Sequence, residues 1–243
     1  DIALVERGLV ATRARARDAI LRGHVTIGGT LAARPSQSVP ADAEIALDDP
    51  AAGYVSRAAL KLVAGLDRFG YSPNGLTALD LGASTGGFTQ VLLERGARKV
   101  FAVDVGHGQL DAALAADRRV VSREGLNARD LVASDVEGSV EAIVTDVSFI
   151  SLRLALPPAL ALATPTAWGI FLVKPQFEVG RANIGKGGIV KDVAARDKAV
   201  VDVVACAVAL GVQHAPIEHK GTIPSPIEGA DGNVEFLTWF RRG

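Results

Sequence analysis

From residue 76 to the end of the chain, short apolar segments alternate with segments of helical periodicity. Such alternation predicts an α/β fold with a parallel, doubly wound sheet. The predicted strands are residues 76–81, 100–104, 119–122, 142–146, 168–174, 213–219 and 233–240. The clearest predicted helices are residues 87–95, 110–116 and 192–210. Ligands of such sheets bind at the carboxyl ends of the strands, so the residues there are the candidates for function.

Residues 1–48 are expected to form a separate small domain. Its apolar spacing predicts two helices, which end at Gly8 and Gly23, followed by short strands. The helical spacing of the first helix starts at Ile2, Thr12 can cap the second helix, and the strands are expected at 25–27 and 45–47. Residues 49–56 have the composition of a linker, and residues 57–243, which begin with a helix, are expected to form the large domain.

The composition excludes several classes of protein. Lysine and arginine number 26 against 27 acidic residues, so any nucleic-acid binding must come from a local basic patch. A single cysteine excludes an internal disulfide and a cysteine-based zinc site, and it fits a cytoplasmic location. The four histidines lack metal-ligand spacing, so no metal is expected. The chain has no methionine, so we expect its natural first residues to precede Asp1.

Residues 154–173 carry no charge and are about as long as a membrane span. Prolines at 157, 158 and 165, with threonines beside the last, favour a helix, a turn and a buried strand of a soluble domain instead. We therefore expect no membrane span.

A glycine-rich loop at residues 79–88, Leu-Asp-Leu-Gly-Ala-Ser-Thr-Gly-Gly-Phe, gives the strongest local signal. An apolar strand ends there and a helix begins. Gly82 permits a tight turn, while Gly86 and Gly87 let a ligand approach the helix N-terminus. The dinucleotide pattern G-x-G-x-x-G is absent, which favours a smaller charged nucleoside over a diphosphate. An ordinary strand-to-helix turn is the alternative.

Polar residues close the neighbouring predicted strands. Asp104 ends the next strand, where a carboxylate accepts ribose hydroxyls in nucleotide-binding sheets. Asn127 follows the third strand and either contacts a base edge or forms a turn. Asp146 and Lys174 end two further strands, and a buried lysine there needs Asp146 as its partner, for a functional or a purely structural ion pair. Glu235 falls inside a predicted strand, either on a solvated edge or at a site.

The first domain is locally basic. Within residues 1–34, six arginines stand against three acidic residues. They are Arg7, Arg13, Arg15, Arg17, Arg22 and Arg34. Such a patch suits contacts with phosphates, and a merely solvated helix is the alternative.

These segments together resemble a known family. Residues 4–10 and 19–29 resemble the S4 RNA-binding domain, and residues 80–89 resemble the cofactor loop of FtsJ-like methyltransferases. With Tyr-Val-Ser-Arg at 54–57 and Gly-Asn-Val-Glu-Phe at 232–236, essentially the whole chain resembles the TlyA family.

The resemblance implies a Rossmann-like methyltransferase domain that uses S-adenosylmethionine, preceded by a small α+β S4 domain. It implies 2′-O-methylation of ribosomal RNA, on a cytidine of 16S or 23S rRNA, with ribosomal subunits as partners and without metal or membrane. A catalytic tetrad of Lys61, Asp146, Lys174 and Glu235 is implied, although spacing alone makes Lys61 a solvated residue of a helix. Threonine at 85 departs from the proline of many FtsJ-like loops.

The implied reaction is an in-line displacement, in which Lys174 acts on the ribose hydroxyl. The residues expected to bind the cofactor are Gly82, Ala83, Ser84, Gly86, Gly87, Phe88, Asp104, Asn127 and Asp146. The residues expected to bind RNA are Arg7, Arg13, Arg15, Arg17 and Arg22.

Three other functions are compatible with parts of the sequence. A ribosome assembly factor that only binds RNA is opposed by the four tetrad residues. A pore-forming hemolysin is opposed by the lack of a clean membrane span or amphipathic pore segment. A nicotinamide-dependent dehydrogenase is opposed by the glycine pattern.

Overall fold

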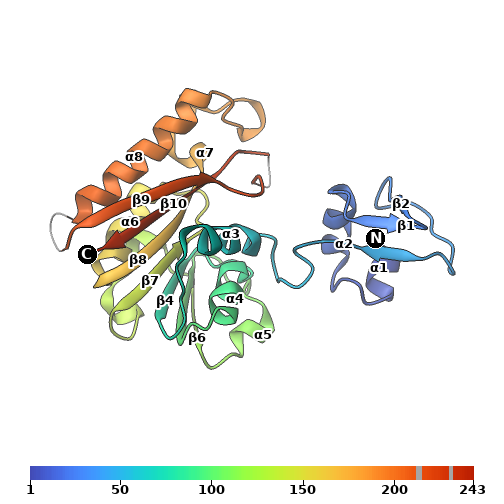
Figure 1. The fold of residues 1–243 in the computed structure, drawn as a ribbon, viewed down its shortest axis with the longest axis horizontal. Helices are drawn as coiled ribbons and strands as arrows, with labels where there is room; N and C mark the ends of the chain where they lie inside the picture. The colour runs from blue at the N-terminus through green and yellow to red at the C-terminus, as the bar shows by residue number, and fades with distance from the viewer. Residues whose placement is uncertain (212–214, 230–231) are drawn as a thin grey trace. The chain divides into compact units, whose positions relative to one another are not determined.

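The computed structural model describes residues 1–211, 215–229 and 232–243, which form two compact units, Asp1–Tyr54 and Val55–Gly243 (Figure 1). Part of the segment expected to be a linker contacts the first unit. The carboxylate of Asp49 pairs with the guanidinium of Arg22 at 2.8 Å. Where the domains begin and end as independently folding parts stays a prediction.

The first unit has two helices and a three-stranded antiparallel sheet in the order β2-β1-β3. Its elements are α1 (Ile2–Glu6), α2 (Arg13–Leu21), β1 (Val25–Ile27), β2 (Thr30–Leu31) and β3 (Ile45–Leu47). Thr12 caps α2 by accepting a hydrogen bond from the amide of Arg15. The predicted helices and strands are confirmed, and β2, which has only two residues, was not predicted. Leu4, Ala16 and Ile20 form part of the small core.

The second unit is built on a seven-stranded sheet in the order β6-β5-β4-β7-β8-β10-β9 (Figure 1). The strands are β4 (Thr77–Leu81), β5 (Lys99–Asp104), β6 (Val120–Glu124), β7 (Val140–Thr145), β8 (Ala163–Val173), β9 (Ile217–Pro224) and β10 (Phe236–Arg242). The helices are α3 (Ala59–Phe69), α4 (Gly87–Glu94), α5 (Ala112–Ala115), α6 (Leu152–Ala161), α7 (Pro175–Glu178) and α8 (Val193–Gly211).

The prediction of an all-parallel sheet is wrong for its last part. Strands β4 to β8 pair in parallel, but β10 runs antiparallel to both β8 and β9. A parallel pair needs a crossover connection of about a dozen residues, usually helical. The described residues between β9 and β10 contain no helix, so the chain turns back and β10 enters the sheet in the opposite direction.

Two helical layers cover opposite faces of this sheet. Successive residues of a strand point to opposite faces, so neighbouring residues of β8 contact different layers. On one face, Gly65 of α3 lies so close to Ile170 of β8 that an added Cβ would come within 3.3 Å of its side chain. On the other face, Phe171 belongs to the main core with residues of α6 and α8, and it stacks on Phe240 at 5.0 Å.

The uncharged stretch at 154–173 lies mostly in α6 and β8, as expected. Pro157 and Pro158 lie inside α6, and the strand begins at Ala163. Among the residues that the structure describes, no helix is long and apolar enough to span a membrane.

Several boundaries differ from prediction. The helix expected at 110–116 is a single turn, α5. Strand β9 begins at Ile217 and runs past the predicted end at 219, while residues 213 and 214 of the prediction lie outside the described residues. Glu235 directly precedes β10 rather than lying within a strand.

Candidate active site

The glycine-rich loop joins β4 to α4, and at two of its glycines a Cβ atom would clash with neighbouring atoms. Gly82 has φ of 82°, and a Cβ there would lie 2.6 Å from the backbone oxygen of Asp146. Gly86 has φ of 98° and precedes α4, where a Cβ would overlap the side chain of Leu114 at 2.4 Å. A side chain at position 82 would therefore require the backbone after β7 to shift, while one at position 86 would displace the Leu114 side chain and strain a left-handed φ.

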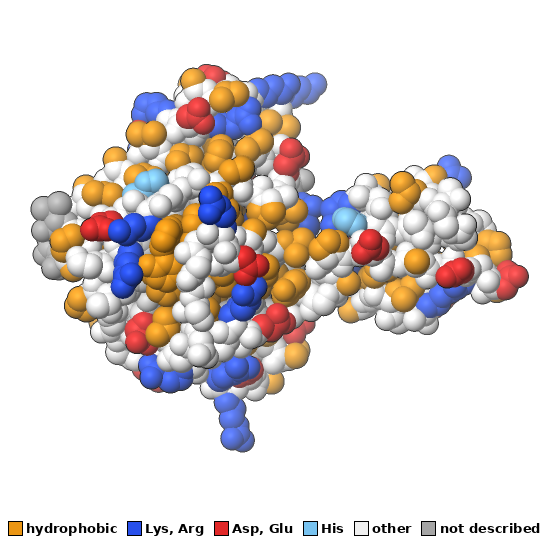
Figure 2. Space-filling view, viewed as in Figure 1, with side chains coloured by type: hydrophobic (Ala, Val, Ile, Leu, Met, Phe, Trp, Pro, Cys, Tyr) orange, Lys and Arg blue, Asp and Glu red, His pale blue; other side chains and the backbone are white. Residues whose placement is uncertain are grey.

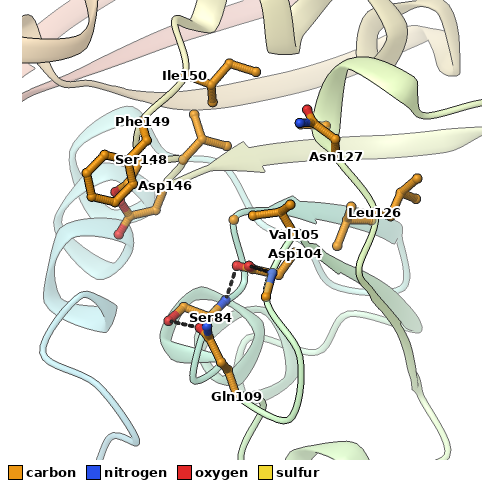
Figure 3. Close-up of a pocket in the computed structure, with 15 residues that line it drawn as sticks. Ser84, Asp104, Val105, Gln109, Leu126, Asn127, Asp146, Ser148, Phe149 and Ile150 are labelled. Carbon is orange, nitrogen blue, oxygen red and sulfur yellow. Dashed lines mark hydrogen bonds between the residues drawn. The ribbon is translucent and has the colours of Figure 1, made fainter.

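Asp104, at the end of β5, holds this loop in place. Its two carboxylate oxygens accept hydrogen bonds from the backbone amides of Ser84 and Gly106, each at 2.8 Å (Figure 3). The Ser84 hydroxyl in turn donates to the side-chain oxygen of Gln109 at 3.1 Å. The carboxylate expected to accept ribose hydroxyls thus also shapes the loop around it.

A cavity of about 460 Å³ opens at the carboxyl ends of β4, β5 and β7 (Figure 3). That volume suits a nucleoside-sized ligand. Of the residues expected to bind the cofactor, those that line it are Gly82, Ser84, Asp104, Asn127 and Asp146. The other expected residues, Ala83, Gly86, Gly87 and Phe88, are buried and shape the turn and the start of α4.

Asn127 forms the turn that was one of its two expected roles, and its contact with a base edge stays a prediction. Its side-chain oxygen accepts a hydrogen bond from the amide of Arg129 at 3.2 Å, which caps a short 3₁₀ turn. The same residue lines the cavity.

Sequence reasoning missed a second carboxylate on this side of the site, Glu124 at the end of β6. It accepts hydrogen bonds from the backbone amides of Gly108, Gln109 and Leu110. These bonds lower the pKa of the Glu124 carboxyl. Its place at the end of a strand, like that of Asp104, was the signal available in the sequence.

Asp80 is fully buried within β4, two residues before Gly82 of the cavity wall. One of its oxygens accepts a hydrogen bond from the hydroxyl of Thr89 at 2.7 Å, and the other has no partner. Burial raises the pKa of the Asp80 carboxyl to about 7, and the nearby carboxylates of Asp146 and Asp104 add to the rise. Three carboxyl groups thus gather at this end of the sheet, a setting that favours a cationic ligand.

A second cavity, of about 430 Å³, adjoins the first, and the two share Asp146, Ser148 and Phe149 in their walls. The four residues of the implied tetrad all line this second cavity. They come from α3 and from the ends of β7, β8 and the segment before β10.

The tetrad forms two ion pairs. The Lys61 ammonium lies 2.5 Å from a Glu235 oxygen, with side chains 8% and 2% exposed. The Lys174 ammonium lies 2.6 Å from Asp146 Oδ1, with side chains 11% and 14% exposed. The interpretation of Lys61 as a solvated residue from its spacing is wrong, because α3 turns it inward towards Glu235. The expected pairing of Lys174 with Asp146 is present.

Two further residues at the junction of the cavities were not predicted. Lys174 Nζ donates a hydrogen bond to Ser148 Oγ at 2.8 Å. Phe149 is 92% exposed, has φ of 63° and packs against Phe177 with ring centroids 5.3 Å apart. A bulky residue in the left-handed region is strained, and such strain gathers at functional sites. Nothing in the sequence signals this conformation.

The five arginines expected to bind RNA fall into two groups. Arg7 donates to the carbonyl oxygens of Ala43 and Ala41, and Arg15 donates to that of Ala51. The guanidinium of Arg22 pairs with Asp18 and with Asp49. These three arginines are engaged with other residues of the first unit.

Arg13 and Arg17 make up the second group, and both are exposed. Arg13 pairs with Asp1 while its own side chain remains 66% exposed. On the face that Figure 2 shows, basic and acidic side chains are interspersed rather than gathered by sign. RNA contacts would therefore rest on a few local cations.

Within the described ranges, no group of three or more His, Cys, Asp or Glu side chains is placed to hold a metal ion.

Both units of the chain are similar to known proteins. Residues 54–242 match the FtsJ-like methyltransferase family, and residues 1–45 match the S4 domain. The chain is 43% identical to the 16S/23S rRNA (cytidine-2'-O)-methyltransferase TlyA of Mycobacterium tuberculosis, over 99% of this chain and 88% of that protein. It is 38% identical to Hemolysin A of Brachyspira hyodysenteriae, over 96% and 95%. A solved protein of Streptococcus thermophilus with a hemolysin name is 38% identical, with a TM-score of 0.78 over 99% and 86%.

Proposed function

We propose that this chain, which belongs to the TlyA family of FtsJ-like methyltransferases and carries an S4 domain, methylates the 2′-oxygen of a cytidine in ribosomal RNA. The two adjoining cavities carry the proposal. One contains the glycine loop and Asp104, the other contains the two lysine–carboxylate pairs, and Asp146 borders both. Donor and acceptor sites that share a wall are what a direct group transfer requires.

S-adenosylmethionine is the proposed cofactor, and it supplies an electrophilic methyl group on a sulfonium. The residues present fit it in size and charge. Asp104 would accept its ribose hydroxyls, and the backbone at Gly82 and Ser84 would lie beside it. Asp104 and Asp146 line the cavity and raise the pKa of the Asp80 carboxyl, which indicates a negative electrostatic potential that favours a ligand with positive charge.

Lys174 is the group proposed to act on the acceptor. A ribose hydroxyl is a poor nucleophile at neutral pH, and a positioned base that removes its proton contributes about 10²–10⁴-fold. Asp146 holds the Lys174 ammonium from the cofactor side. The buried Lys61–Glu235 pair lines the same cavity and would fix the ribose through its charges.

The RNA would be held at two places. The exposed ring of Phe149 offers a stacking surface for a base at the mouth of the second cavity. The S4 unit would contribute phosphate contacts through exposed cations such as Arg17, which fix position rather than read sequence. The names of the relatives support a 16S or 23S rRNA target and a cytoplasmic site of action.

The experiment is to map 2′-O-methyl groups in ribosomal subunits incubated with cofactor and the full chain. Lys174→Ala should lower the single-turnover rate by about 10²–10⁴-fold with little change in cofactor affinity. Lys198→Ala is the matched control, since Lys198 is exposed on α8 and pairs only with Asp202 in the contacts described. Methyl transfer to RNA with a 2′-deoxy residue at the mapped site would exclude ribose chemistry.

A further inference from the structure

We infer that Ser148 is a positioning residue that aims the amine of Lys174 at the acceptor hydroxyl. The inference rests on the proposed function and deepens it. Among the described residues, two polar groups contact Lys174 Nζ: Asp146 Oδ1 at 2.6 Å and Ser148 Oγ at 2.8 Å. The contact with Ser148 has the geometry of a hydrogen bond, whereas the contact with Asp146 Oδ1 is an ion pair without that geometry.

The difference between the two contacts affects the orientation of the Lys174 amine. A carboxylate near an ammonium attracts the charge but does not by itself fix the orientation of the three N–H bonds. A hydrogen bond to a hydroxyl oxygen fixes the direction of one N–H bond. It thereby restricts the directions of the other two N–H bonds, or of one N–H bond and the lone pair when the amine is neutral. For Lys174, whose stem is flexible, Ser148 supplies this directional contact.

The location of Ser148 agrees with such a role. It lines the cofactor-side cavity and the tetrad cavity, together with Asp146 and Phe149. Its neighbours hold it there, since Val147 is buried on one side and Phe149 takes a left-handed φ of 63° on the other. The turn therefore presents the hydroxyl at the point where the two cavities meet.

The chemistry of a hydroxyl also suits both states of the lysine. In the transfer, the 2′-oxygen bonds to the methyl carbon while the carbon–sulfur bond breaks with its electrons going to sulfur, and the hydroxyl proton goes to Lys174 Nζ. Ser148 Oγ can accept a hydrogen bond from an N–H of the amine in both its protonated and its neutral state, which leaves the lone pair of the neutral amine free to take the proton of the 2′-hydroxyl. The contact with Ser148 is thus available before and after the proton moves.

The test compares three variants of the full chain. Ser148→Thr keeps the hydroxyl, Ser148→Val has the same shape as threonine without it, and Ser148→Ala removes it without added bulk. We expect the valine and alanine variants to lose about 10- to 100-fold in single-turnover rate at saturating cofactor and RNA, the range that a small misplacement produces. The threonine variant should stay within about threefold of the unchanged chain, on the same basis.

Two further readouts separate positioning from a structural role. The pH dependence of the single-turnover rate should change in Ser148→Ala and Ser148→Val but not in Ser148→Thr, while cofactor affinity and thermal unfolding stay the same in all three. Ser72→Ala is the control, because Ser72 accepts a hydrogen bond from the Asn74 amide on the loop after α3.

The inference is overturned if Ser148→Ala keeps the rate and pH dependence of the unchanged chain, or if Ser148→Thr is as slow as Ser148→Val. In those cases the unchanged chain still methylates RNA, so the proposed function stands. If the unchanged chain gives no 2′-O-methyl product, the proposed function fails and this inference fails with it.

Discussion

The ammonium of Lys61 and the carboxylate of Glu235 meet at 2.5 Å although 174 residues separate them in the sequence. Both side chains are almost fully removed from water. Removing two charges from water carries a large desolvation cost, which only close mutual contact offsets. The pair therefore ties α3 to the segment before β10, and either partner alone would be an unstable buried charge.

The Lys61–Glu235 contact predicts that a double variant can recover stability without recovering methyl transfer. Lys61→Met should destabilise the large unit by about 3–5 kcal/mol, because the Glu235 carboxylate is left without its partner. Lys61→Met combined with Glu235→Gln should recover much of that loss, yet both variants should lack methyl transfer. Urea unfolding measures the first effect. A double variant no more stable than Lys61→Met would contradict the role of the buried charge.

Asp104 should control cofactor affinity. Its carboxylate holds the amides of Ser84 and Gly106 and lines the first cavity. Asp104→Ala should weaken binding of S-adenosylmethionine by roughly 1–3 kcal/mol, the cost of losing hydrogen bonds to a charged group. Calorimetric titration measures this. Asp117→Ala is the control, since Asp117 lies before β6 and binds Arg119, and equal affinities in the two variants would remove Asp104 from the site.

The buried carboxyl of Asp80 should make stability fall as pH rises. Its pKa is about 7 in the folded protein against 3.8 for an unperturbed aspartate, and burial is the main cause. Between those values the folded chain holds a proton that the unfolded chain has lost. The penalty is absent below the lower pKa and complete above the upper one, and it amounts to roughly 4 kcal/mol at most.

Asp80→Asn removes this titration and can keep the hydrogen bond from Thr89. Its stability should rise relative to the unchanged chain as pH increases from about 4 to 8, because only the unchanged chain bears the growing penalty. Denaturant unfolding at several pH values gives the comparison. Parallel stability curves for the two proteins would show that Asp80 does not titrate in this range.

Substitution of an exposed arginine of the first unit should affect RNA binding, whereas substitution of an ion-paired one should affect stability. Arg17 is exposed, so Arg17→Ala should weaken RNA binding and reduce the slope of log affinity against log salt by about one, without affecting unfolding. Arg22 pairs with the nearly buried Asp49, so Arg22→Ala should lower the unfolding temperature. Filter binding across salt concentrations and thermal unfolding measure the two effects. Equal salt slopes for Arg17→Ala and the unchanged chain would argue against phosphate contact.

Much of the fold was predictable because its signals are local. Apolar runs, helical spacing and glycines located most elements of both units, although β2 was missed and ends of β8 and β9 differ by five residues. The ends of β5, β7 and β8 located the candidate residues Asp104, Asp146 and Lys174. The order and direction of β9 and β10 were not predictable in this way. Local periodicity does not say whether a strand enters a sheet parallel or antiparallel, since that depends on the connection and the edge that is free.

The sequence by itself determined the order of strands, loops and helices and the position of the glycine-rich loop. The φ values of 82° at Gly82 and 98° at Gly86 favour glycine for local steric reasons, whatever the rest of the chain does. Only the tertiary structure decided that Lys61 is buried against Glu235 and that Lys174 forms a hydrogen bond with Ser148. It also decided which arginines are engaged within the first unit. These outcomes depend on contacts between residues distant in sequence, and burial, ion pairing and hydrogen-bond direction exist only once those residues meet.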